Sequence, residues 1–177
     1  MNITGFGIAI LQWLPLFVFL SFARFNEMSD DLWRQAFYVS SICALVVTAF
    51  LIYKKIILDR LRFGINLFLI SGAFAFLTDS ESVLRFFEAN KGVVFFSGII
   101  AVGLLTTLFS PLGFIGISVR DKQQLKKMSF VLLGATIGAL IWSVFMNDYD
   151  TLVAVVVPFI ALRFLRKALI DKLENAH

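Results

Sequence analysis

The stretch RDKQQLKKMSFVLLGATIGALIWSVFMNDYD, residues 120–150, carries the pattern that decides the fold. It begins with a basic block, runs from Met128 to Met146 without a charge, and ends on the acidic turn NDYD. A helix of about 20 mostly apolar residues crosses the ~30 Å hydrocarbon core of a bilayer. Such a helix satisfies its own backbone hydrogen bonds in that core. The stretch therefore predicts a membrane-spanning helix with one basic end and one acidic end.

Similar apolar segments fill most of the chain. Hydrophobic residues make up 59% of the 177 residues and include 21 Phe, which excludes a water-soluble domain with an ordinary surface. We predict an all-α membrane protein: a six-transmembrane-helix bundle in one domain over residues 1–165, followed by a basic amphipathic cytoplasmic tail over residues 166–177. The predicted spans cover residues 3–22, 37–53, 61–77, 92–117, 128–146 and 151–165.

Basic residues collect at alternate ends of these spans. Twelve Lys and Arg residues lie at one set of ends and four at the other. Because Lys and Arg near span ends are retained in the cytoplasm, the bias predicts that the N and C termini are cytoplasmic. The inner set is Lys54, Lys55, Arg60, Arg62, Arg120, Lys122, Lys126, Lys127, Arg163, Arg166, Lys167 and Lys172, and the outer set is Arg24, Arg34, Arg85 and Lys91. The inner set predicts anionic lipid headgroups as partners, and we expect no nucleic-acid partner.

The fourth predicted span, residues 92–117, is longer than a bilayer requires. It contains Ser110, Pro111 and Gly113 near its end. Proline interrupts the hydrogen-bond ladder of a helix. We therefore expect a kink or an early end at Pro111, with the remainder lying in the membrane interface.

The sixth predicted span is the shortest. Its uninterrupted apolar run extends only from Leu152 to Leu162, and Pro158 is expected to kink it. The segment reaches spanning length if Arg163 extends its guanidinium to the headgroups. The alternative is a re-entrant or interfacial segment, which would place the basic residues that follow on the outer side.

Beyond this span, Leu165, Leu169 and Leu173 recur at helical spacing among basic residues. The pattern predicts an amphipathic helix. Two interpretations stay open: the tail is the anchored end of the last span, or it is a helix that docks on lipid or on a partner.

Few residues are suited to catalysis. The single histidine is His177, so a haem held by two histidines or a histidine-based metal site is excluded, and we expect no cofactor. Asp148 and Asp150 could form a carboxylate pair, but a short polar turn between helices uses Asp for capping, which we favour. No ionisable residue lies near the middle of a predicted span. We predict that the protein is not an enzyme.

The polar residues inside the spans are neutral. We single out a possible polar seam, formed by Gln12, Asn66, Thr106, Thr107 and Thr136. Such side chains hydrogen-bond between helices, which is the interpretation we favour. They could instead line a path for a neutral solute or lipid, as in a small transporter or channel.

Gly134 and Gly138 form a GxxxG spacing in the fifth span. Two small residues one turn apart allow another helix to approach closely. The sequence leaves open whether that helix belongs to the same chain or to a second copy.

The first part of the chain, over about 110 residues, resembles the intracellular septation protein A family of small bacterial inner-membrane proteins. The likeness rests on WLPLFVFLSF (residues 13–22) and on the hairpin NLFLISGAFAFLTDSESVLRFFEANKGVVFFSGIIAVGLL (residues 66–105). The matching positions are Leu14, Pro15, Gly72, Asp79, Phe86, Phe87 and Lys91. Members tend to have Pro shortly after the Lys, where this chain has Gly92 and Val93.

The resemblance implies a multispanning protein of the bacterial inner membrane that contacts division or elongation machinery and has no catalytic site. We therefore expect an interaction or scaffold subunit for envelope maintenance or septation. The competing hypotheses are a small transporter or channel and an accessory subunit of a larger membrane complex.

Overall fold

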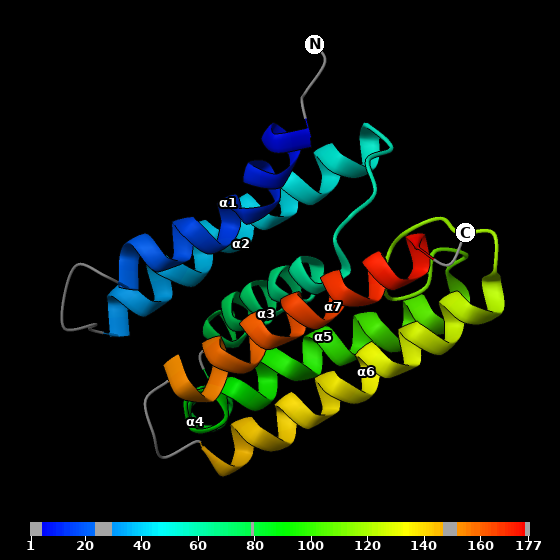
Figure 1. Ribbon diagram of the computed structural model, residues 1–177. Helices are drawn as coiled ribbons and strands as arrows, with labels where there is room; N and C mark the ends of the chain where they lie inside the picture. The colour runs from blue at the N-terminus through cyan, green and yellow to red at the C-terminus, as the bar shows by residue number, and fades with distance from the viewer. Residues whose placement is uncertain (1–4, 24–29, 79, 147–151, 176–177) are drawn as a thin grey trace. The chain divides into compact units, whose positions relative to one another are not determined.

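The computed structural model describes residues 5–23, 30–78, 80–146 and 152–175, and these residues are almost entirely helical (Figure 1). The helices are α1 Gly5–Ala23, α2 Asp30–Tyr53, α3 Arg60–Leu77, α4 Glu81–Ala89, α5 Lys91–Phe109, α6 Lys122–Phe145 and α7 Val157–Glu174, with a π-helical turn, η1, over Leu152–Val156. No strand occurs within the described ranges. The all-α prediction is confirmed for them.

The chain divides into two compact units, residues 1–87 and 88–177, each described here by itself. The sequence predicts one membrane domain over residues 1–165, which stays a prediction. Hydropathy identifies apolar segments but carries no information on which of them pack together, so it cannot reveal this division.

Unit 1 contains α1, α2, α3 and most of α4, and its core is aromatic. The Phe37 ring of α2 lies directly against Gly72 of α3, where a Cβ atom would overlap it. Around Phe37 the rings form contacts with centroids 4.9–6.0 Å away, a spacing typical of favourable aromatic pairs. The partner rings are Phe19, Trp33, Phe68, Phe76 and Phe87.

Close helix packing in unit 1 comes from small residues on α2. Ala36, Ser40 and Ala44 recur every fourth residue and are fully buried. Residues four apart share one helix face, so these three form a continuous small-residue ridge. α2 packs along both α1 and α3.

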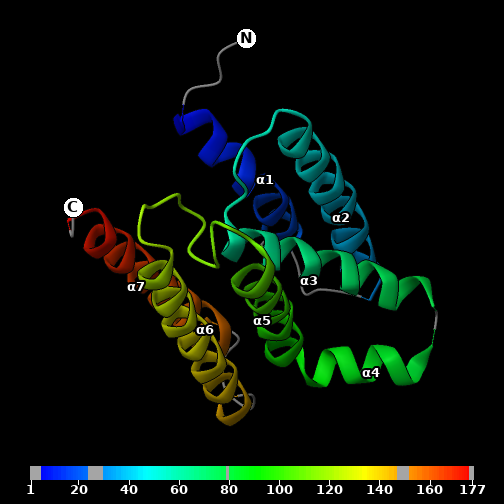
Figure 2. The same cartoon turned by 90° about the vertical axis from the view of Figure 1, so that its right-hand side faces the viewer.

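Unit 2 contains α5, α6, η1 and α7, and its core includes part of a loop. The chain turns after α5, and Gly113 and Gly116 adopt positive φ angles of 58° and 81°. Glycine reaches this left-handed region without steric cost. The reversal places Phe114 and Ile115 in the core, both fully buried. α6 and α7 then run antiparallel side by side (Figure 2).

Four described helical segments are long and apolar enough to cross a membrane: Asp31–Tyr53, Arg60–Leu77, Gly92–Phe109 and Lys122–Phe145. A fifth apolar segment, Gly7–Phe22 of α1, is shorter. α7 is not among them. The structure therefore supports transmembrane character, whereas the six-span count stays a prediction.

The fourth predicted span, residues 92–117, ends early, as expected at Pro111. α5 ends at Phe109 because Ser110, Pro111 and the left-handed glycines form a turn. In the last segment, Pro158 comes just after the π-helical turn η1. It lies in the first turn of α7, where its missing N–H is tolerated.

α7 continues without a break past residue 165, where the last span was predicted to end and the tail to begin. Leu169 and Leu173 of the expected tail are buried within unit 2. The apolar stripe of the tail is thus occupied by its own unit, which agrees with an anchored helix end. His177, Asp148, Asp150 and Asp79 lie outside the described residues.

Candidate functional site

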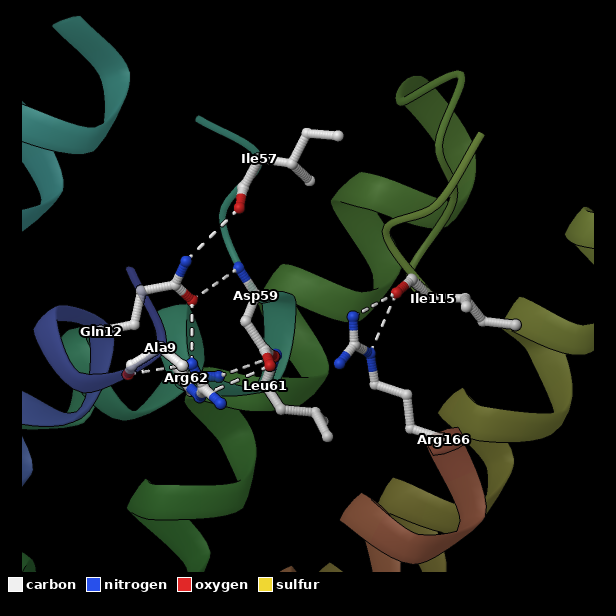
Figure 3. A network of polar contacts seen from close by, with 8 residues as sticks. All are labelled: Ala9, Gln12, Ile57, Asp59, Leu61, Arg62, Ile115 and Arg166. Carbon is white, nitrogen blue, oxygen red and sulfur yellow. Dashed lines mark hydrogen bonds and ion pairs between the residues drawn. The ribbon is translucent and has the colours of Figure 1, made fainter. Parts of the chain in front are cut away.

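The candidate site in unit 1 is a polar network around the loop of residues 54–59, drawn in Figure 3. Gln12 of α1 reaches this loop with both ends of its amide. Its Nε2 donates to the Ile57 carbonyl over 3.4 Å, and its Oε1 accepts from the Asp59 N–H over 3.2 Å. The loop backbone lies outside any helix, so its polar groups need such partners.

Arg62 and Asp59 form a largely buried ion pair within this network. The Arg62 Nε lies 3.5 Å from the Asp59 Oδ2, and the two side chains are only 12% and 13% exposed. Arg62 Nη1 also donates to Gln12 Oε1 and to the Ala9 carbonyl, each over 3.4 Å. Its guanidinium lies 4.8 Å from the centroid of the Trp13 ring. A buried charge is tolerated when it is paired and hydrogen-bonded in this way.

The Asp59 carboxylate has a second role, as the N-cap of α3. Its Oδ1 accepts from the backbone N–H groups of Leu61 and Arg62, over 3.1 and 3.5 Å. One carboxylate thus starts α3, pairs with Arg62 and belongs to the loop that Gln12 holds. The network fixes the loop to both α1 and α3.

A separate network in unit 2 holds the loop of residues 110–121. Arg166 of α7 donates from Nε and Nη2 to the Ile115 carbonyl, over 3.0 and 2.7 Å (Figure 3). The neighbouring Phe114 N–H donates to the Ser129 Oγ of α6 over 3.1 Å. A guanidinium presents several donors in a fixed plane, which suits two bonds to one carbonyl. Side chains of α6 and α7 therefore form hydrogen bonds with two adjacent loop residues.

The residues of the predicted polar seam use their polar groups in three ways. Gln12 holds the loop, and Asn66 Nδ2 donates to Thr48 Oγ1 over 3.1 Å, a contact between α3 and α2. Thr106 and Thr136 donate to carbonyls of their own helices, at Val102 and Leu132, over 2.6 and 2.9 Å.

Thr107 is the exception. Its hydroxyl is buried and has no hydrogen-bond partner among the described residues. Gln12 and Asn66 belong to unit 1 and the three threonines to unit 2, and the polar seam as a whole stays a prediction.

Gly134 and Gly138 lie on an open face of α6. A Cβ atom added at either position would meet nothing within 4 Å. At Gly103, in contrast, it would meet Leu133 and Phe114 at 2.9–3.1 Å. The GxxxG pair therefore does not mediate close helix packing within unit 2, and the small-residue ridge of α2 does so in unit 1.

The positions that carry the family resemblance have mixed surroundings. Pro15, Gly72 and Phe87 are buried in unit 1, where Gly72 and Phe87 contact Phe37. Leu14 and Phe86 are exposed. The buried ones have a packing role.

Sequence reasoning missed both loop networks. The sequence places Arg62 and Arg166 among the inner basic residues, and charge alone does not reveal a partner about fifty residues away. One local signal was present: Asp59 precedes α3 as an N-cap residue and stands three positions before Arg62.

Among the described residues, no group of three or more His, Cys, Asp or Glu side chains is placed to hold a metal ion. Comparisons of the chain with protein-family models, curated proteins and solved structures found no match.

Proposed function

We propose that the chain is a non-enzymatic interaction or scaffold subunit of the bacterial inner membrane, acting in cell-envelope maintenance or septation. In this proposal it crosses the membrane six times and keeps both termini in the cytoplasm. The envelope role comes from the resemblance to the septation family. The interaction role is supported by the structure of the loops.

The observation that carries the proposal is the anchoring of both predicted cytoplasmic loops. Gln12 and Arg62 hold the first loop, and Arg166 and Ser129 hold the second. A loop held in one conformation loses less entropy on binding a partner than a flexible connector. The loops are thus preorganised surfaces, as an interaction subunit requires.

Exposed lysines lie beside both loops. Lys54 and Lys55 are exposed in the first, and Lys126 and Lys127 are exposed on α6 beside the second. Complementary charge speeds encounter with an acidic partner and selects against basic ones. A partner with an acidic cytoplasmic segment fits these surfaces.

The open face at Gly134 and Gly138 supports the same proposal within the membrane. A GxxxG face that its own unit leaves uncovered suits a close helix contact with another membrane protein or with a second copy. This feature also agrees with an accessory subunit of a larger membrane complex.

The transporter hypothesis keeps one supporting observation, the buried hydroxyl of Thr107 without a described partner. A buried hydroxyl that has no described hydrogen-bond partner could form a hydrogen bond with a ligand that binds transiently. The other four seam residues are bonded within the chain, so the interaction role is the better supported of the two.

Affinity purification from native membranes in mild detergent, followed by mass spectrometry, tests the proposal. We expect reproducible recovery of division or envelope-synthesis proteins, and lower recovery with Lys126→Gln/Lys127→Gln. Arg85→Gln is the matched control, because Arg85 is exposed and predicted to lie on the outer side. A protein that purifies alone, together with a deletion strain of normal shape and stress tolerance, would overturn the proposal.

A further inference from the structure

The two antiparallel helices of unit 2 differ in the length of their uncharged stretch. On α6 the stretch begins after Lys127 and lasts to the end of the helix at Phe145. Along η1 and α7 it lasts only from Leu152 to Leu162, and Arg163 follows. At 1.5 Å per residue, the stretch on α6 is about 27 Å long and the one on η1 and α7 about 16 Å. Only the first approaches the ~30 Å of a hydrocarbon core.

Hydrogen bonds fix how the two helices are aligned. Near one end, Trp142 Nε1 of α6 donates to the Val153 carbonyl of η1 over 3.1 Å. Toward the other end, Ser129 and Arg166 bind the adjacent loop residues Phe114 and Ile115. Thirteen residues separate Ser129 from Trp142, and thirteen separate Val153 from Arg166. Trp142 therefore lies within side-chain reach of Val153 at one end, and Ser129 and Arg166 reach the same loop at the other end.

This alignment places basic residues of α7 beside the apolar part of α6. Counting residues from these contacts puts Arg163 near the level of Leu132, five residues inside Lys127 and about 7–8 Å along the helix axis. Lys167 is level with Met128, the first residue of the uncharged stretch. Lys172 is level with Gln123, among the basic residues at the start of α6.

The charged side chains are accessible at this depth. Lys167 is exposed and Arg163 is half-buried, and since they are four residues apart they share one flank of α7. Phe164, which is next to Arg163 in the sequence and to one side of this flank, is 70% exposed, so an apolar surface continues beside the charges. The acids Asp171 and Glu174 lie closer to the end of the helix, and no ion pair joins either to Lys167 in the described part of the chain.

We infer that the flank of α7 formed by Arg163 and Lys167 binds the headgroup of an anionic phospholipid, which is drawn below the surrounding headgroup plane. The inference rests on the proposed membrane location. Basic side chains that lie below the interface recruit phosphate groups and locally thin the bilayer. A hydrophobic stretch shorter than the hydrocarbon core also thins the bilayer around it. Phe164 contacts the acyl chains of the same lipid.

The occupant is a lipid because both kinds of surface are present together. A basic pair accounts for an anionic headgroup, and basic sites beside membrane helices take such headgroups. The exposed Phe164 beside the charges favours an amphiphile over a soluble anion. The experiment distinguishes binding of a lipid on this flank from binding of a protein segment there.

The test uses the full chain reconstituted in phosphatidylcholine vesicles with and without phosphatidylglycerol, with bound lipid measured by native mass spectrometry. We expect selective retention of phosphatidylglycerol. Lys167→Gln should weaken it about five-fold, which corresponds to about 1 kcal/mol for one basic residue near the membrane surface. Lys167→Arg should restore it, because the charge returns. Arg163→Gln/Lys167→Gln should abolish selectivity.

Lys172→Gln is the matched control. Lys172 is exposed on the same helix, but it lies near the plane of the surrounding lipid headgroups. We expect it to change retention less than two-fold. Equal losses with Lys167→Gln and Lys172→Gln would show only a diffuse surface charge and overturn the inference, as would retention without preference or a tightly bound protein in place of lipid. A chain that alkaline carbonate extracts from the vesicles would overturn the membrane proposal itself.

Discussion

Arg166 donates two hydrogen bonds to the Ile115 carbonyl, so that α7 holds a loop residue 51 positions earlier in the chain. The carbonyl belongs to a fully buried residue. Without the guanidinium it would lose both described donors. The contact therefore links the stability of the loop to the position of α7.

Replacing Arg166 with Met should destabilise unit 2. A buried carbonyl left unsatisfied costs about 1–3 kcal/mol, and the loss should appear as a lower unfolding temperature in detergent. Arg166→Lys should recover only part of it, because an ammonium cannot reproduce the planar fork. Lys172→Met removes an exposed charge from the same helix and should leave the unfolding temperature nearly unchanged. Equal effects of the Arg166 and Lys172 variants would contradict the role of the loop contact.

Replacing Asp59 with Asn should separate the two roles of its carboxylate. Asn is also a good N-cap, so the start of α3 is retained, whereas Arg62 loses its charged partner. Removing one member of a buried pair costs about 3–5 kcal/mol. Asp59→Asn/Arg62→Met should be more stable than Asp59→Asn alone, since no buried charge then lacks its partner. Thermal unfolding in detergent measures both, and a double variant less stable than the single one would contradict this account.

Glycine substitutions in the two units should have opposite effects. Gly72→Ala places a Cβ atom where the Phe37 ring lies, and overpacking costs about 1–3 kcal/mol. Gly134→Ala meets no atom, and alanine favours a helix interior by about 0.5–1 kcal/mol over glycine. Equilibrium unfolding of both variants tests the comparison. Destabilisation by Gly134→Ala would mean that another helix covers that face.

Gly138→Leu should change association and not folding. The side chain would project from the open face of α6, so the unfolding temperature of dilute protein should stay unchanged. Recovery of a membrane partner, or the oligomer size in mild detergent, should decrease because a bulky side chain prevents close helix approach. Ile137→Leu, a substitution at a neighbouring exposed apolar position, is the control. Unchanged association would exclude the GxxxG face as an interface.

The sequence identifies the helices well because their driving pattern is local. A charge-free run of spanning length predicts α6, and the Ser110–Pro111 step anticipates that α5 ends early. Prediction from the sequence fails where an apolar run continues beyond the end of the helix. Phe114 and Ile115 look like the end of a span, yet left-handed glycines fold them into the core.

The candidate site was less predictable because its contacts are long-range. Gln12 was expected between helices or along a path, and its partners in the loop follow only from folding. The GxxxG motif attracted attention as a packing face, whereas Ala36, Ser40 and Ala44 mediate close packing in unit 1. Spacing shows that a helix can approach but not whether one does.

The anchoring of the two loops also imposes an order on synthesis. Gln12 leaves the ribosome 45 residues before the Ile57 carbonyl that it binds, so the first loop meets its anchor as soon as it is made. In the second loop Ser129 follows Phe114 by 15 residues, but Ile115 must wait for Arg166, 51 residues later. At about 5–20 residues per second that interval lasts several seconds. During it Ile115 lacks its anchor, and the newly made hairpin of α5 and α6 is the stage at which chaperone or insertase contact is most needed.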